Sequence, residues 1–298
     1  MTRLILAALL GGASLLAPAA PAAAQATAPA FAPTRFSVTV EGEGPDVILI
    51  PGLSTSREVW DGARAALRGR YRLHLVEIAG FGGSAAGPNA TGEILPGLVE
   101  ELSRYIAANR LRQPAVVGHS MGGFIGLLLA RSHPDRVGRL MIVDSLPFIG
   151  VLFAPGATAA AIAPQAAGYR DMVRGRGRSA SPEAAAAQAP GMSATPDGQL
   201  QVGRLTFEAD PAVMAQAMYE VMTTDLRGDL ARISTPITML YPWQAGVLPE
   251  ERARALYEGE YRSARNARLV AIPQSRHFVM IDQPDRFAAE LRTFLERR

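Results

Sequence analysis

The sequence predicts an α/β fold in which a mostly parallel sheet is covered by helices on both faces. Two observations support this. From Phe36 onward, short β-rich apolar runs alternate with longer helix-like stretches, and a G-x-S-x-G motif stands between one such run and the next helix. The chain has 298 residues, 48% of them hydrophobic, which is enough for a substantial core.

The N-terminus has the pattern of an export signal. Arg3 precedes an apolar run over residues 4–16, and Ala24-Gln25-Ala26 matches an A-x-A cleavage site. We therefore expect a signal peptide over residues 1–26, then an Ala/Pro-rich disordered leader over residues 27–35. The alternative is an uncleaved anchor, although the run is shorter than the about 20 residues that a membrane span needs. The expected protein is exported, periplasmic or secreted, with no stable membrane span after cleavage.

The α/β core is expected over residues 36–145 and 225–298. Helix-like stretches occupy residues 98–109, 121–132 and 285–296. The predicted strands cover residues 36–40, 47–50, 73–78, 115–117, 140–143, 237–241 and 269–272. Alternation of this kind is typical of parallel strands joined by helices.

Residues 146–224 interrupt this alternation. They carry no clear strand, are rich in Ala, Pro and Gly, and show helical stretches near 183–189 and 211–223. Because the segment lies between two strands of the sheet, we expect a helical cap inserted into the core.

Composition excludes several classes of function. The chain has no Cys, which removes disulfides and thiol catalysis, and its four His are scattered without metal-ligand spacing. No metal site is therefore predicted. The formal net charge is only +3, so a nucleic-acid partner is not expected.

The motif that carries chemistry is Gly118-His119-Ser120-Met121-Gly122. It follows a predicted strand and opens a predicted helix, which is the context of a nucleophile elbow. A sharp turn there exposes the Ser120 hydroxyl, and the flanking glycines let the backbone pass without clashing Cβ atoms. The free N–H groups at the helix N-terminus can stabilise a developing oxyanion.

Four segments together resemble the α/β-hydrolase superfamily, from Val38 to the end of the chain with the cap excepted. They are IPGLSTS at 50–56, EIAGFGGS at 77–84, VGHSMGG at 117–123 and SRHFVMIDQPDRF at 275–287. The resemblance implies an α/β-hydrolase fold with Ser120 as nucleophile. It makes His277, near the C-terminus, the general base that takes the serine proton.

The resemblance also implies an oxyanion hole made of two backbone N–H groups. One belongs to Met121, which follows the nucleophile, and the other to Leu53, in the loop after an early strand. The family often has His-Gly in that loop, where this chain has Pro51-Gly52. Because the donor is main chain, the geometry can survive the change.

The third member of the triad departs from the family pattern. The usual acid follows the strand at 237–241, where Ala245 stands in its expected place. We expect Asp144, after the strand at 140–143, to orient the imidazole instead. The alternatives are Glu250, Glu251, or no acid at all.

The predicted function is that of a serine hydrolase acting on a carboxylic ester or related acyl bond through an acyl-enzyme on Ser120. No metal or organic cofactor is implied. The partner is a small-molecule ester or acyl substrate, and the apolar cap favours a hydrophobic one. Two alternatives remain open. One is a catalytically weakened binding protein of the same fold, and the other is a lactonase, amidase or perhydrolase variant.

Overall fold

The computed structural model of the protein describes residues 31–154 and 156–297. The predicted signal peptide over residues 1–26 and residues 27–30 of the predicted leader lie outside the described residues.

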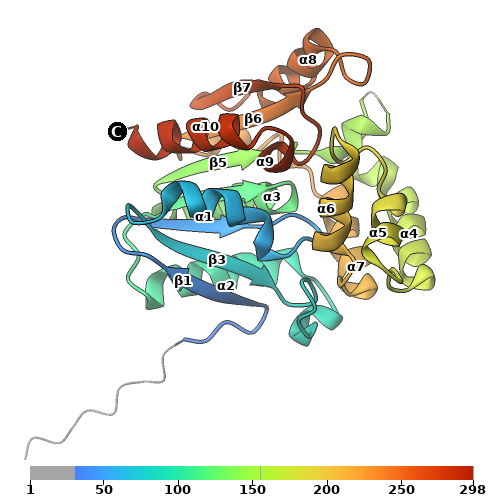
Figure 1. Cartoon of the computed structure of the whole chain (residues 1–298), viewed down its shortest axis with the longest axis horizontal. Helices are drawn as coiled ribbons and strands as arrows, with labels where there is room; N and C mark the ends of the chain where they lie inside the picture. The colour runs from blue at the N-terminus through green and yellow to red at the C-terminus, as the bar shows by residue number, and fades with distance from the viewer. Residues whose placement is uncertain (1–30, 155, 298) are drawn as a thin grey trace, which may run out of the picture. The chain divides into compact units, whose positions relative to one another are not determined.

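A seven-stranded sheet forms the centre of the molecule (Figure 1). Its order is β1-β3-β2-β4-β5-β6-β7; β1 pairs antiparallel with β3, and all other neighbours are parallel. The strands are β1 (Phe36–Glu41), β2 (Asp46–Ile50), β3 (Arg72–Ile78), β4 (Ala115–His119), β5 (Arg139–Val143), β6 (Ile237–Trp243) and β7 (Ala267–Pro273). The predicted mostly parallel sheet is confirmed.

Helices cover both faces of this sheet, as predicted. On one face lie α1 (Asp61–Leu67) and α10 (Pro284–Glu296), and on the other lie α2 (Leu95–Ala108), α3 (Met121–Ser132) and α8 (Glu250–Tyr261). The short α9 (Val279–Asp282) precedes α10. Single turns of 3-10 helix lie at η1 (Arg57–Trp60), η2 (Gly87–Ala90), η3 (Pro134–Arg136), η4 (Ile149–Leu152) and η5 (Leu230–Arg232).

The central strands are apolar on both sides because each side has its own core. In β2, Val47 and Leu49 pack with α1 and α10, whereas Ile48 and Ile50 pack with α2 and α3. All four side chains are fully buried. Continuous apolar runs of this kind are what a parallel sheet buried on both faces requires.

Between β5 and β6 lie four further helices (Figure 1). They are α4 (Ala159–Arg176), α5 (Pro182–Gln188), α6 (Pro196–Thr206) and α7 (Pro211–Thr223), and α4 packs on α7 while α5 packs on α6. Each follows a capping residue whose side-chain oxygen accepts a hydrogen bond from a backbone N–H of the first turn. The capping residues are Thr158, Ser181, Thr195 and Asp210 respectively. These caps determine where the four helices begin. Hydrophobic periodicity alone does not predict α4 and α6, because the segment is rich in Ala, Pro and Gly.

The helical insertion is tied to the core by hydrogen bonds. The Glu220 carboxylate of α7 accepts the backbone N–H groups of Ile94, at 2.9 Å, and Leu95, at 2.7 Å. A carboxylate is favoured there because the first N–H groups of α2 have no partner within the helix. Asp210 also donates its backbone N–H to the Gly80 carbonyl at 2.7 Å.

The last residues of the expected leader contact α2. The buried Glu101 carboxylate on α2 accepts the backbone N–H of Thr34, at 2.8 Å, and that of Arg35, at 2.9 Å. The Arg104 guanidinium also stacks over the Phe31 ring, 4.9 Å from its centroid. A buried carboxylate needs such donors, and residues 34 and 35 supply them.

Two glycines provide a matched test of how tightly the nucleophile turn is packed. A Cβ on Gly122 would lie 2.2 Å from the Ile50 carbonyl oxygen, whereas one on Gly168, inside α4, would meet nothing within 4 Å. We expect Gly122→Ala to lower the free energy of unfolding by about 3 kcal/mol or more. Gly168→Ala should raise it by about 0.5–1 kcal/mol. Chemical denaturation of both variants measures this, and equal stabilities would contradict the packing described.

Candidate active site

The three candidate side chains lie at the carboxyl ends of parallel strands, on one edge of the sheet. Ser120 follows β4, Asp144 follows β5, and His277 follows β7. From β2 the chain first adds β3 on one side and then β4 to β7 on the other side. Open α/β sheets bind ligands in the crevice where the direction of strand addition changes in this way. The topology therefore gathers residues separated by up to 157 positions in sequence, from 120 to 277.

Ser120 occupies a strained turn. Its backbone has φ 52° and ψ −121° and stands immediately before α3, a conformation that costs a non-glycine residue energy. The Ser120 N–H donates to the Val143 carbonyl at 2.9 Å, which holds the turn against β5. A Cβ on Gly118 would lie 2.3 Å from the Gly122 carbonyl carbon, so the G-x-S-x-G spacing is a steric requirement of this turn.

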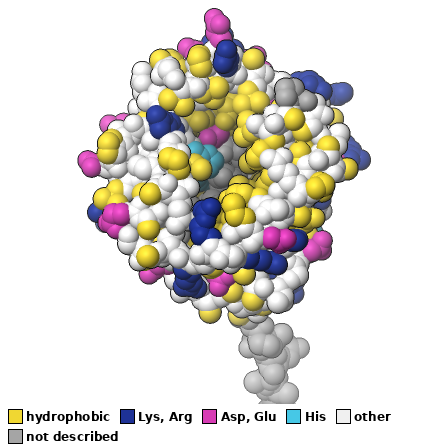
Figure 2. Space-filling view, turned by 90° about the vertical axis from the view of Figure 1, so that its right-hand side faces the viewer, with side chains coloured by type: hydrophobic (Ala, Val, Ile, Leu, Met, Phe, Trp, Pro, Cys, Tyr) yellow, Lys and Arg dark blue, Asp and Glu magenta, His cyan; other side chains and the backbone are white. Residues whose placement is uncertain are grey.

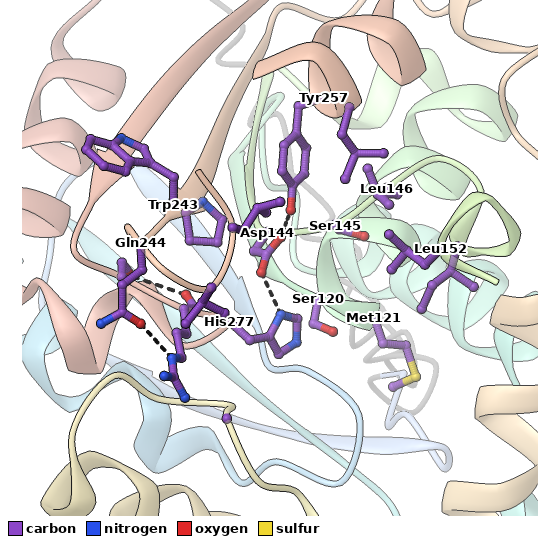
Figure 3. A pocket seen from close by; sticks show the side chains of 18 of the residues that line it. Ser120, Met121, Asp144, Ser145, Leu146, Leu152, Trp243, Gln244, Tyr257 and His277 are labelled. Atoms are coloured by element: carbon purple, nitrogen blue, oxygen red, sulfur yellow. Dashed lines mark hydrogen bonds and ion pairs between the residues drawn. The ribbon is translucent and has the colours of Figure 1, made fainter. Parts of the chain in front are cut away.

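Asp144 lies directly against the base. Its Oδ2 is 2.7 Å from His277 Nδ1, so the imidazole donates Nδ1–H to the carboxylate and leaves Nε2 free to accept a proton. Asp144 has a left-handed backbone, with φ 48°, and donates its N–H to the Leu240 carbonyl at 2.9 Å. Figure 3 shows the Ser120 side chain beside the His277 ring.

The alternative acids are elsewhere. Glu250 pairs with Arg254 at 2.6 Å on the first turns of α8, and neither Glu250 nor Glu251 lines the cavity that holds Ser120. Ala245, in the loop after β6, is exposed. Of the predicted acids, the structure brings only Asp144 to His277.

Tyr257 is a member of the site that sequence reasoning missed. From α8, its hydroxyl donates to Asp144 Oδ1, so the two carboxylate oxygens receive one donor each (Figure 3). Burial, together with the charge of Asp144, raises the pKa of Tyr257 well above its ordinary value. The hydroxyl therefore keeps its proton and remains a donor. No sequence signal links a helical Tyr to an Asp 113 positions earlier.

His119, the variable residue of the motif, packs directly against His277. It is fully buried, and its Nε2 lies 3.0 Å from the His277 carbonyl oxygen. The two imidazole rings are in contact, with centroids 4.6 Å apart. Burial, and next the charge of His277, lower the pKa of His119 well below its ordinary value. His119 is thus a neutral packing residue.

The predicted oxyanion donors lie near the nucleophile. Met121 is the first residue of α3, where backbone N–H groups have no partner within the helix, and it lines the cavity. The loop that contains Leu53 passes close by, since a Cβ on Gly52 would lie 3.2 Å from Ser120 Cβ. Leu53 itself does not line the cavity, so its part in an oxyanion hole stays a prediction.

The cavity at this site has a volume of about 280 Å³. Its wall is mostly apolar, and Figure 2 shows a hollow with a His side chain inside it, surrounded by hydrophobic side chains. The apolar lining comes from the core and the insertion, through Leu146, Ile149, Leu152, Val221, Pro242, Trp243, Val247, Leu248 and Leu256. The lining is therefore suited to an apolar group of an ester next to Ser120.

Neither a metal site nor a membrane helix appears over residues 31–154 and 156–297. In that part of the chain, no group of three or more His, Asp or Glu could hold a metal ion. Among the same residues, no helix is long and apolar enough to cross a membrane.

Comparison with known proteins identifies the family of the chain. The family model described as "Alpha/beta hydrolase family" matches residues 47–290. Pimeloyl-[acyl-carrier protein] methyl ester esterase of Aeromonas hydrophila subsp. hydrophila is 32% identical over 270 residues, covering 87% of this chain and 100% of that protein. The corresponding esterase of Aeromonas salmonicida is 29% identical, with the same coverage.

Solved structures show the same fold. A thermophilic esterase from Thermogutta terrifontis superposes with a TM-score of 0.71 at 22% identity, covering 87% of this chain and 92% of that one. The enol-lactonase from Burkholderia xenovorans gives a TM-score of 0.69 at 20% identity, covering 88% of this chain and 96% of that one. The family match and the fold lead to one conclusion: the chain belongs to the α/β-hydrolase family.

Proposed function

We propose that this α/β hydrolase cleaves carboxylic esters through an acyl-enzyme on Ser120. The observation that carries the proposal is the 2.7 Å contact between Asp144 Oδ2 and His277 Nδ1, beside a serine in a nucleophile elbow. The relatives named as esterases support the bond type.

The chemistry follows from these positions. His277 Nε2 takes the Ser120 proton as Oγ attacks the ester carbonyl, and Asp144 stabilises the imidazolium that forms. The tetrahedral oxyanion accepts hydrogen bonds from the backbone N–H groups of Met121 and Leu53. The imidazolium then protonates the leaving alkoxide, and a water activated by His277 releases the acid and regenerates Ser120.

Substitution of the three side chains tests this mechanism. We expect Ser120→Ala and His277→Ala to lose about 10⁶ in kcat, and Asp144→Asn about 10⁴ because the imidazole loses its orienting acceptor. Glu250→Gln and Glu251→Gln are matched controls that remove a carboxylate outside the cavity, and they should keep wild-type rates. Hydrolysis of p-nitrophenyl esters from acetyl to palmitoyl provides the measurement.

A covalent intermediate is tested separately. A fluorophosphonate should label the wild type on Ser120, and p-nitrophenyl ester hydrolysis should begin with a burst of one nitrophenolate per active site if deacylation is slow. A folded wild type that is neither labelled nor faster than Ser120→Ala would favour the binding-protein alternative.

Tyr257 provides a test of how the acid is held. Tyr257→Phe removes one donor from Asp144, and since a hydrogen bond to a charged group contributes about 1.5–3 kcal/mol, we expect kcat to fall by about tenfold. Tyr261→Phe is the control. Its hydroxyl lies one turn further along α8, is equally buried, and donates to the Ser145 carbonyl instead. Comparable loss of kcat in both variants would mean that the Tyr257 hydroxyl has no specific role.

We also propose export, on the pattern of residues 1–26 alone. Signal cleavage after Ala26 would leave Thr27 as the first residue. N-terminal sequencing of the full-length product from the periplasm or medium tests this, and a product that retains Met1 in the cytoplasm would overturn it.

A further inference from the structure

We propose that Arg276 is a specificity-determining residue that binds an anionic group of the ester substrate, either a carboxylate or a phosphate. The inference rests on the proposed ester hydrolysis and adds a class of substrate to it. Arg276 directly precedes His277 and lines the same cavity as Ser120.

The charges of the cavity are few. Arg276 is the only Lys or Arg among its lining residues in the described part of the chain, and Asp144 is the only carboxylate. Figure 2 shows a basic side chain at the edge of the hollow that holds the His. Because most of the remaining wall is apolar, an opposite charge brought there by a ligand interacts more strongly than it would in water.

Three contacts hold Arg276 in place. Its backbone N–H donates to Asp282 Oδ2 at 2.7 Å, and its Nε–H donates to Gln244 Oε1 at 2.7 Å. Gly191 of the insertion lies against the guanidinium, since a Cβ there would stand 3.3 Å from Nη1. A side chain fixed in this way loses little conformational entropy on binding a ligand.

The outer nitrogens of the guanidinium remain available. Among residues 31–154 and 156–297, no carboxylate forms an ion pair with Arg276, and its only side-chain hydrogen bond uses Nε and a neutral amide oxygen. An arginine stays charged at any physiological pH. Its remaining N–H groups form a planar fork that matches two oxygens of a carboxylate or a phosphate.

With Asp144 after β5, the loop after β6 brings no carboxylate to the Arg276 guanidinium. The loop after β6, where the family usually has its acid, here presents the neutral Gln244 to Arg276 and carries Ala245. Asp144 lies on the neighbouring strand and already accepts from His277 and Tyr257. An acid at the usual place would repel an anionic substrate or neutralise Arg276, and here neither effect operates.

Matched pairs of esters test the proposal with the wild-type protein. The carboxylate arm compares monomethyl adipate with methyl hexanoate, and the phosphate arm compares acetoxyethyl phosphate with its dimethyl triester. We expect kcat/KM to favour the anionic member of at least one pair by about tenfold, and added NaCl to weaken that preference by screening. The arm that shows the preference identifies the source of the anion.

Variants assign the preference to the side chain. Arg276→Gln should raise KM for the preferred anionic ester by about tenfold and leave its neutral partner nearly unchanged, because only the charged contact is lost. Arg276→Lys should keep part of the preference, since it keeps the charge without the fork. The control is Arg252→Gln, which removes the same charge from an exposed position of α8 outside the cavity, and it should keep the wild-type ratio.

Two results would overturn the proposal. One is an active wild type with no salt-sensitive preference in either arm, which needs no variant to be folded. The other is an Arg276→Gln protein with unchanged thermal stability in which both members of a pair lose activity equally. Failure of ester hydrolysis itself is a separate outcome: the wild type would then match Ser120→Ala on every ester, neutral or anionic.

Discussion

The hydrogen bond between Asp144 and His277 is the contact on which the rest of the site depends. It sets which imidazole nitrogen carries the proton, and therefore whether the other nitrogen can act on Ser120. The bond forms because both residues lie at the same edge of the sheet. Asp144 follows β5 and His277 follows β7, with only β6 between these strands. The backbone of Asp144 adopts a left-handed conformation to present its carboxylate there.

The elements around the proposed acid, Asp144, fit its place after β5. Helix α8 places Tyr257 where it donates to the second oxygen of Asp144, so the carboxylate is held from two sides. The loop after β6 brings no acid to His277, and its Gln244 accepts a hydrogen bond from Arg276 Nε–H. Both arrangements keep negative charge at one point of the cavity, beside the imidazole.

The sequence predicted the sheet well because its signals are local. Apolar runs bounded by turns mark all seven strands, and the elbow glycines mark the turn that exposes Ser120. In the insertion, α5 and α7 were expected, but α4 and α6 were not, because an Ala-, Pro- and Gly-rich sequence gives little periodicity. The caps at Thr158 and Thr195 were the signals that could have located them.

The site was only partly predictable, for a physical reason. Ser120 and His277 lie in motifs, and Asp144 follows a recognisable strand, so each could be named from its neighbours in sequence. The Tyr257–Asp144 and Arg276–Gln244 contacts join segments that only the folded sheet brings together. The sequence around each of these residues contains no pattern that predicts which residue it contacts.

The proton between His277 and Asp144 provides the most direct measurement of the central claim. A hydrogen bond from Nδ1–H to a carboxylate shifts that proton far downfield in the NMR spectrum of the wild-type protein. We predict such a resonance in the wild type and in Glu250→Gln, and its loss in folded Asp144→Ala. A resonance that persists in Asp144→Ala, or that disappears in Glu250→Gln, would show that the imidazole is oriented by another group.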